Sequence, residues 1–242
     1  MKSGLIVFLV LSAAALAQRP AWDFQGGFRG LFQGKVVTGE PYSGTGVTTR
    51  NQTLANGNTI NESSCAKLYR DTAGRTRREE TRNSATCSAT PESILIRDPV
   101  AGVEYAINMR NNTYRQLTIK APSAEAAALR TRTRPANPNE VKTSLGTMAI
   151  PGTSLSAENT QTVTTIPAGR FGNAQAITIT ETRSYSPDLQ ILVQSSRTDP
   201  RSGVTTYQLS NIATLEPAET LFQLPSGLTL QQGPSARGRR AP

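Results

Sequence analysis

Hydrophobic and polar residues alternate with a period of two along most of this chain, in short runs bounded by turn residues. Successive side chains of a strand project to opposite faces of a sheet, so this pattern predicts strands with one buried face and one wetter face. Val103, Tyr105 and Ile107, for example, alternate with more polar or smaller neighbours. The predicted strands lie within residues 42–54, 59–70, 75–82, 92–97, 103–109, 113–120, 141–150, 154–167, 176–185, 189–197 and 204–212.

Turn residues separate these runs. The Asn56-Gly57 pair between the first two runs is the strongest short-range hairpin signal, and "DTAG" at 71–74 closes the second hairpin. Asp98 and Asp199 each precede a proline, which is also turn chemistry. Short strands and turns at this repeated spacing predict an all-β fold, built as an extended antiparallel sheet that is curved or nearly closed.

One segment departs from the strand pattern. Ala124–Leu129 is the best helix-forming run, with Ser123 as its N-cap and with Pro135 and Pro138 ending it. It predicts one short helix, which either lies across the sheet or forms a lid over it.

The first residues have the composition of a targeting segment. Lys2 precedes a short apolar run and the small residues Ala15-Leu16-Ala17. This is typical of a cleaved secretory signal peptide, so we expect a periplasmic or secreted protein that does not span the membrane. The predicted segments are a signal peptide at 1–17, a Gly/aromatic arm at 18–33, one antiparallel β domain at 34–230 and a disordered basic tail at 231–242. The arm either covers an open edge of the sheet or docks on a partner.

Cys65 and Cys87 are the two cysteines of the chain. In an oxidising compartment an isolated pair predicts a disulfide. If Ala73-Gly74 is a two-residue tip, Cys65 faces Arg82, and a straight hairpin leaves Cys87 beyond the ~4.4–6.8 Å between α-carbons that the bond requires. We therefore expect residues 83–86 to fold back toward Cys65 and the bond to have a structural role.

The chain offers little catalytic chemistry. It has no histidine, which removes the commonest general base and the usual partner of a serine or cysteine nucleophile. Its carboxylates show no catalytic spacing, and two thiols without histidine make a poor metal site. We therefore predict that the protein is not an enzyme and that it needs neither metal nor cofactor.

The stretch 68–82 carries five arginines in a chain whose net charge is +9. Strand alternation divides these arginines between two faces, nearby acids neutralise them in part, and aromatic residues make up 5% of the chain. Because base stacking needs aromatic side chains, nucleic acid is not a predicted partner. We interpret the stretch as a solvated, charged hairpin.

Several segments resemble a recurring group of exported bacterial proteins. They include "GKVVTGEPYSGTGVT", "LYRDTAGRTRREET", "ILIRDPVAGVEYAI" and the ending "PAETLFQLPSGLTL". The strand order and the ending, with Phe222, Pro225 and Gly227, are more distantly similar to LolA-like lipoprotein-carrier folds. That resemblance implies a half-barrel with a helix or loop over its concave side, where carriers of this type hold acyl chains. This chain departs from them, because its strands carry many threonines and few bulky aromatic residues.

The resemblance implies a cell-envelope binding or carrier-like module for a lipid, lipoprotein or other amphiphile. The candidate ligand-binding residues on the concave face are Val103, Tyr105, Ile107, Ile177, Ile179, Ile191 and Val193. The alternative for these residues is plain core between sheet and helix. The alternative for the protein is a structural or protein-interaction module of the envelope, with a protein partner and no small-molecule ligand.

Overall fold

The computed structural model describes residues 36–88, 90–119 and 137–231. The chain divides into two compact units, 1–34 and 35–242, and every described residue belongs to the second. The predicted signal peptide, N-terminal arm and helix lie outside the described residues, and so does the basic tail beyond its first residue.

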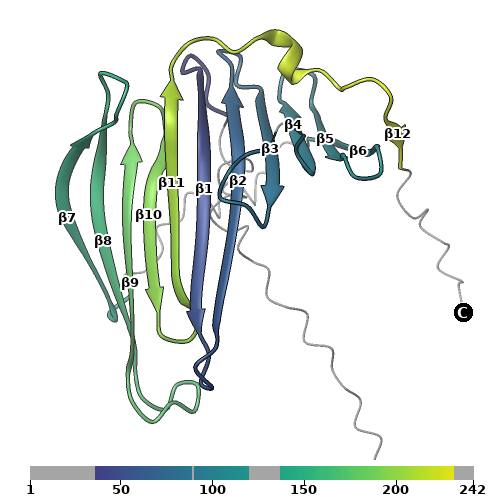
Figure 1. Ribbon diagram of the computed structural model, residues 1–242. Helices are drawn as coiled ribbons and strands as arrows, with labels where there is room; N and C mark the ends of the chain where they lie inside the picture. Colours follow the sequence, from purple (N-terminus) through teal and green to yellow (C-terminus); the bar gives the residue numbers. More distant parts are fainter. Residues whose placement is uncertain (1–35, 89, 120–136, 232–242) are drawn as a thin grey trace, which may run out of the picture. The chain divides into compact units, whose positions relative to one another are not determined.

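One 12-stranded sheet dominates the described part of the chain. Its strands are β1 (Tyr42–Thr53), β2 (Thr59–Arg70), β3 (Thr76–Arg82), β4 (Ser93–Asp98), β5 (Val103–Asn108), β6 (Thr113–Thr118), β7 (Glu140–Ala149), β8 (Ser156–Ile166), β9 (Ile177–Ser186), β10 (Ile191–Asp199), β11 (Gly203–Ala213) and β12 (Thr229–Leu230). A 3₁₀ turn, η2 (Glu219–Phe222), precedes β12. From edge to edge the order is β12-β6-β5-β4-β3-β2-β1-β11-β10-β9-β8-β7 (Figure 1).

The neighbouring strands are antiparallel throughout, except that β12 pairs with β6 in parallel. The sheet is open and curved (Figure 1). The predicted all-β class and the extended antiparallel sheet are therefore confirmed. Consecutive strands pair as hairpins in most of the sheet, because short turns follow the strands where the sequence places Asn, Asp and Gly.

Large side chains of β11 lie over the small residues of β1 in the middle of the sheet. A Cβ atom on Gly46 would lie 2.8 Å from Cε2 of Tyr207, and one on Gly44 would lie 2.9 Å from Cδ1 of Leu209. Glycine is thus required where the Tyr207 ring lies directly on the β1 backbone. Tyr207 and Leu209 are both buried by this packing.

The turn between β2 and β3 has three residues, not the predicted two. The Asp71 N–H donates to the Arg75 carbonyl at 3.1 Å, and the Gly74 N–H donates to the Asp71 carbonyl at 3.0 Å. Gly74 has a φ of +82°, which a side chain would disfavour. Cys65 consequently pairs with Thr81, so the predicted register is wrong by one residue.

Cys65 and Cys87 form the predicted disulfide, with their Cα atoms 5.0 Å apart. After β3, Asn83 adopts a left-handed φ of +52°. The Ser84 N–H then donates to the Ser63 carbonyl at 3.2 Å, which turns the chain back toward β2. Cys87 lies in the link between β3 and β4, and Cys65 is a buried residue of β2. The bond therefore attaches this link to the sheet.

Candidate functional site: the two faces of the sheet

Strand register defines two faces of the sheet. Residues that pair across neighbouring antiparallel strands project from the same face. We call the face that carries Thr45 face A; Thr45 pairs with Lys67 of β2 and with Ser210 of β11. We call the opposite face, which carries Tyr42 and Gly46, face B.

Face A is uncharged over six adjacent strands, β1 and β7–β11, all of which are fully described. Its polar residues there are Ser43, Thr45, Thr49, Asn51 and Thr53 of β1, Thr206, Gln208 and Ser210 of β11, Gln194, Ser196 and Thr198 of β10, Thr178, Thr180, Thr182, Ser184 and Ser186 of β9, Asn159, Gln161 and Thr165 of β8, and Thr143 of β7. The remaining positions are aliphatic, mainly valine. We refer to this area as the uncharged surface.

Hydroxyl and amide side chains follow one another across the uncharged surface. One row in register consists of Thr49, Thr206, Ser196, Thr182, Gln161 and Thr143. The hydroxyls of Thr49 and Thr206 lie 2.7 Å apart, within hydrogen-bond distance. Neighbouring strands are about 4.8 Å apart, so the row repeats a polar group at that interval. Its members are half-buried or exposed.

The same six strands carry all of their charges on face B. These residues are Arg50, Glu140, Lys142, Glu158, Glu181, Arg183, Arg197 and Asp199. Arg197 lies 3.5 Å from Glu181, and Arg201 in the following turn lies 2.7 Å from Asp199. The hydrogen bond from Arg201 lowers the pKa of the Asp199 carboxyl below its usual value. Charge is thus segregated by face, with ion pairs on one side and neutral hydrogen-bonding groups on the other.

Two arginines of the β2–β3 hairpin are buried, so the prediction of a solvated hairpin is wrong for them. Arg70 is 5% exposed and donates to the carbonyls of Glu40 and Leu189, at 2.6 Å for each from Nη2. Its guanidinium lies 4.8 Å from the Tyr42 ring centroid, and burial lowers the pKa of Arg70. Arg77 is 7% exposed and donates to the Leu221 carbonyl at 2.9 Å. Both arginines therefore connect β2 and β3 to backbone segments that are distant in the sequence.

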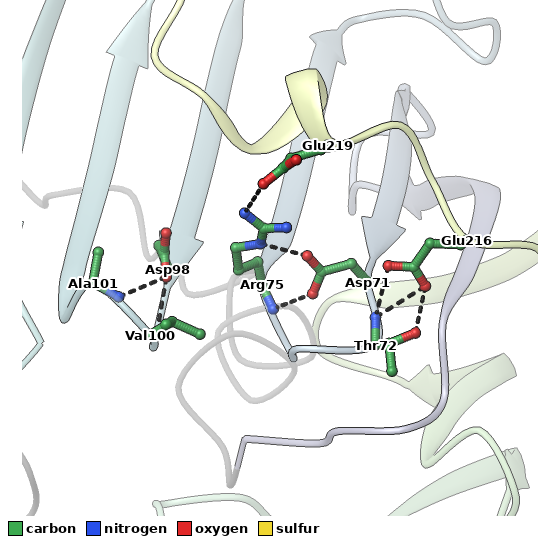
Figure 2. Close-up of polar contacts among 8 residues, drawn as sticks. All are labelled: Asp71, Thr72, Arg75, Asp98, Val100, Ala101, Glu216 and Glu219. Atoms are coloured by element: carbon green, nitrogen blue, oxygen red, sulfur yellow. Dashed lines mark hydrogen bonds and ion pairs between the residues drawn. The ribbon is translucent and has the colours of Figure 1, made fainter.

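The C-terminal segment is fastened to the tip of that hairpin. Figure 2 shows the Asp71 carboxylate accepting the backbone and side-chain N–H groups of Arg75, whose Nη1 reaches Glu219 at 3.2 Å. The Thr72 N–H donates to Glu216 at 3.1 Å in the same view. Contacts between residues 71–75 and 216–219 therefore position η2 beside the β2–β3 turn.

Asp98 and Asp199 perform the turn role that the sequence predicts. Asp98 Oδ1 accepts the N–H groups of Val100 and Ala101, each at 2.8 Å (Figure 2). Asp199 Oδ1 accepts the Arg201 N–H at 3.0 Å. Among the described residues, no three His, Cys, Asp or Glu residues are arranged to hold a metal ion.

The segment that follows η2 covers face A at the other end of the sheet. Ile94, Ile96 and Ile107 form a buried cluster on β4 and β5. Leu224 and Leu228 pack against this cluster, together with partly buried side chains of β5 and β6. The apolar part of face A is therefore closed by the chain itself.

The seven predicted ligand-binding residues are not gathered on one face. Val103, Tyr105 and Ile107 lie on face A of β5, where Tyr105 and Ile107 belong to the cluster beneath the C-terminal segment. Ile177 and Ile179 lie on face B of β9, by their pairing with Ile166 and Thr164. Ile191 and Val193 are buried on β10. Strands β4, β3, β2, β1 and β11 separate β5 from β10, so no common concave patch forms. A ligand-binding role for these residues stays a prediction.

Hydrophobic periodicity does not reveal the uncharged surface, because most of its residues are polar. Its signal is nevertheless present in "TITETRSYS" of β9, where Thr and Ser occupy every second position and the charged Glu181 and Arg183 fall between them. Charged residues that alternate with neutral ones along a strand lie on one face of the sheet, just as alternating hydrophobic residues do.

No protein-family profile and no curated protein matches this chain. Solved structures do match it. The Pseudomonas aeruginosa MucA/MucB complex is 12% identical with a TM-score of 0.41, over 77% of this chain and 56% of that chain. A LolA superfamily protein from Nitrosomonas europaea is 7% identical with a TM-score of 0.31, over 78% and 92%. LprF from Mycobacterium bovis is 16% identical with a TM-score of 0.30, over 74% and 89%.

The chain spans less than two thirds of the length of the MucB chains that it matches. These similarities concern the fold. A LolA superfamily protein and a lipoprotein-sorting protein domain are among the similar structures.

Proposed function

We propose that this protein is a non-catalytic binding module of the cell envelope, which holds a macromolecular partner on the uncharged surface of its sheet. The observation that carries the proposal is the segregation of charge: eight charged residues of β1 and β7–β11 share face B, and none lies on face A. A solvent-facing sheet normally carries charged side chains, which also oppose association. Rows of neutral donors and acceptors instead favour a partner that is itself neutral and polar.

The geometry favours this function over a carrier of a small amphiphile. A lipid carrier needs a continuous apolar concavity, and pockets for apolar ligands are lined mostly by apolar side chains. The candidate apolar residues lie on opposite faces, and Tyr105 and Ile107 of β5 belong to the cluster that Leu224 and Leu228 pack against. Five of the eight charged side chains of face B are engaged in ion pairs, namely Arg50, Glu181, Arg183, Arg197 and Asp199.

An exported location fits the structure. The Cys65–Cys87 disulfide requires an oxidising compartment to form and persist, such as the periplasm or the exterior of the cell. No helix in residues 36–88, 90–119 and 137–231 has the length and apolarity to cross a membrane. The disulfide is the observation on which we propose a periplasmic or extracellular location.

The test uses two adjacent positions that point to opposite faces. A photo-crosslinking amino acid is placed at Thr182 on face A or at Arg183 on face B, and the full chain is irradiated in its own host. We expect one discrete adduct from position 182 and none from position 183. Equal yields from both positions, or no adduct from either, would contradict the proposal.

A charge placed on the surface gives a second, independent measurement. Ser196→Glu on face A should lower the adduct yield from position 182 by about tenfold, because the partner would have to bury an unpaired carboxylate. Ser195→Glu, its neighbour on face B, is the matched control and should leave the yield unchanged. Native mass spectrometry of the same preparation identifies the competing function, since co-purified acyl chains with no crosslinked partner would favour an amphiphile carrier.

A further inference from the structure

The loop between β8 and β9 presents a bare aromatic side chain. Phe171 is 69% exposed and lies between Gly169 and Gly172, beside the exposed Arg170. Most of the Phe171 ring is in water in the free protein, so its burial against a partner would be favourable.

The backbone around Phe171 is held in a defined conformation. The Phe171 N–H donates to Asn173 Oδ1 at 3.1 Å. Nδ2 of Asn173 donates to the carbonyls of Pro167 at 3.0 Å and Gln175 at 2.6 Å, and the Gly169 N–H donates to the Asn173 carbonyl at 2.8 Å. Asn173 thus forms hydrogen bonds with backbone groups on both sides of the loop and fixes the backbone that carries Phe171. The display is preorganised, which lowers the entropic cost of binding.

The loop extends one end of the sheet. The β1–β2 turn, the β10–β11 turn and the β8–β9 loop lie at the same end, and the β8–β9 loop reaches farthest (Figure 1). Gln52 Nε2, next to the β1–β2 turn, donates to the Arg201 carbonyl of the β10–β11 turn at 3.4 Å, so these two turns are neighbours. Leu54 is a further exposed aliphatic residue at this end.

The charge of the β8–β9 loop favours an anionic partner. Residues 167–176 contain Arg170 and no acid. An aromatic side chain next to an arginine suits a lipid–water interface, where the ring enters the acyl boundary and the guanidinium contacts headgroup phosphates. Anionic lipids attract basic groups close to the surface.

We propose that the β8–β9 loop docks the protein onto an anionic lipid surface, with Phe171 inserted into the interface and Arg170 bound to phosphates. The docking is peripheral, because one short loop enters only the headgroup and upper acyl region. It is independent of the uncharged surface and orients the sheet with its β8–β9 end toward the membrane.

The experiment measures partition of the full mature chain onto large vesicles of phosphatidylcholine, with and without an equal part of phosphatidylglycerol. Phe171→Ser should lower partition onto the anionic vesicles about tenfold, through lost apolar burial. Arg170→Gln should lower it about fivefold on anionic vesicles and leave the weak binding to phosphatidylcholine unchanged. Leu215→Ser is the matched control, since Leu215 is 79% exposed beyond the opposite end of β11 and should leave partition within about twofold.

Phe171→Trp reports insertion directly. Its emission, compared with that of the parent chain, should shift to the blue on anionic vesicles and be quenched by brominated acyl chains. Raising the salt concentration should weaken binding, because exposed charges are screened. Equal partition of the parent and Phe171→Ser proteins, or a tryptophan at 171 that stays in water on bound vesicles, would overturn the proposal. Absence of vesicle binding by the parent chain would do the same and would point to a protein partner for the loop.

Discussion

Arg70 is a cation that the fold surrounds with backbone carbonyls and an aromatic ring. Its Nε and Nη2 atoms donate to Glu40 at 2.8 and 2.6 Å, and Nη2 also donates to Leu189 at 2.6 Å. These acceptors come from the segment before β1 and from the β9–β10 turn, far from Arg70 in the sequence. The planar guanidinium suits this role, because it donates to several acceptors in fixed directions.

Arg70→Met is the corresponding prediction at the residue scale. Methionine keeps much of the apolar stem but leaves two carbonyls without their donor, so the free energy of unfolding should fall by about 3 kcal/mol. Urea unfolding followed by circular dichroism measures the change. Arg82→Met is the control, since Arg82 is exposed at the end of β3 and its loss should cost no more than about 0.5 kcal/mol. Equal effects of the two substitutions would contradict the structural role of Arg70.

At the scale of elements, the strands and turns could be predicted from the sequence, whereas the residue register between strands and the long-range side-chain contacts could not. The Asn56-Gly57 hairpin, the proline turns and the alternating runs follow from local chemistry, and the strands lie within a few residues of the predicted ranges. The β2–β3 register was wrong because two-residue and three-residue turns use similar residues, and Gly74 suits either. The buried state of Arg77 depends on the Leu221 carbonyl, 144 positions away, which no local pattern reveals.

The β10–β11 turn gives a prediction about pH. The hydrogen bond from Arg201 lowers the pKa of Asp199 in the folded protein. The carboxylate therefore adds stability above the unfolded pKa of about 3.9, and this stability is lost as the pH falls through the folded value. Asp199→Asn should lower the free energy of unfolding by about 1 kcal/mol at pH 6. The difference from the parent should shrink toward zero as the pH falls below the folded pKa of Asp199.

Arg201→Gln tests the cause of that shift. Removing the donor should reproduce the loss at pH 6 and flatten the acid-dependent part of the profile, because the Asp199 pKa then moves back toward its ordinary value. A gap between the parent and Asp199→Asn that stays constant from pH 6 to about pH 2 would contradict this account.

At the scale of the sheet, face A consists of two areas with different side chains. Over β4–β6 the chain closes its own apolar cluster with Leu224 and Leu228. Over β1 and β7–β11 the same face carries no charged residue, and its polar side chains are half-buried or exposed except for Ser184 and Ser186. The sequence predicted an extended sheet that is curved or nearly closed. Its candidate apolar residues lie on more than one face, because periodicity assigns a residue to one of two faces without showing which residues are continuous across many strands. That continuity comes from register across many strands, including the bulges in β1–β11 and β9–β10.

Phe222 tests whether the C-terminal segment stabilises one end of the sheet or all of it. Its side chain is 4% exposed, and the Arg75 guanidinium lies 5.3 Å from its ring centroid. Phe222→Ala should cost about 3–4 kcal/mol, by lost burial and the cavity left behind. Loosening of the segment should expose the Ile94 cluster, so amide hydrogen exchange should accelerate in β4–β6 and change little in β8–β10, which the segment does not touch. Leu215→Ala, at an exposed position of the same segment, should leave both regions unchanged. Uniform acceleration across all strands would show instead that the sheet unfolds as one unit, and the C-terminal segment would then be part of a single cooperative core.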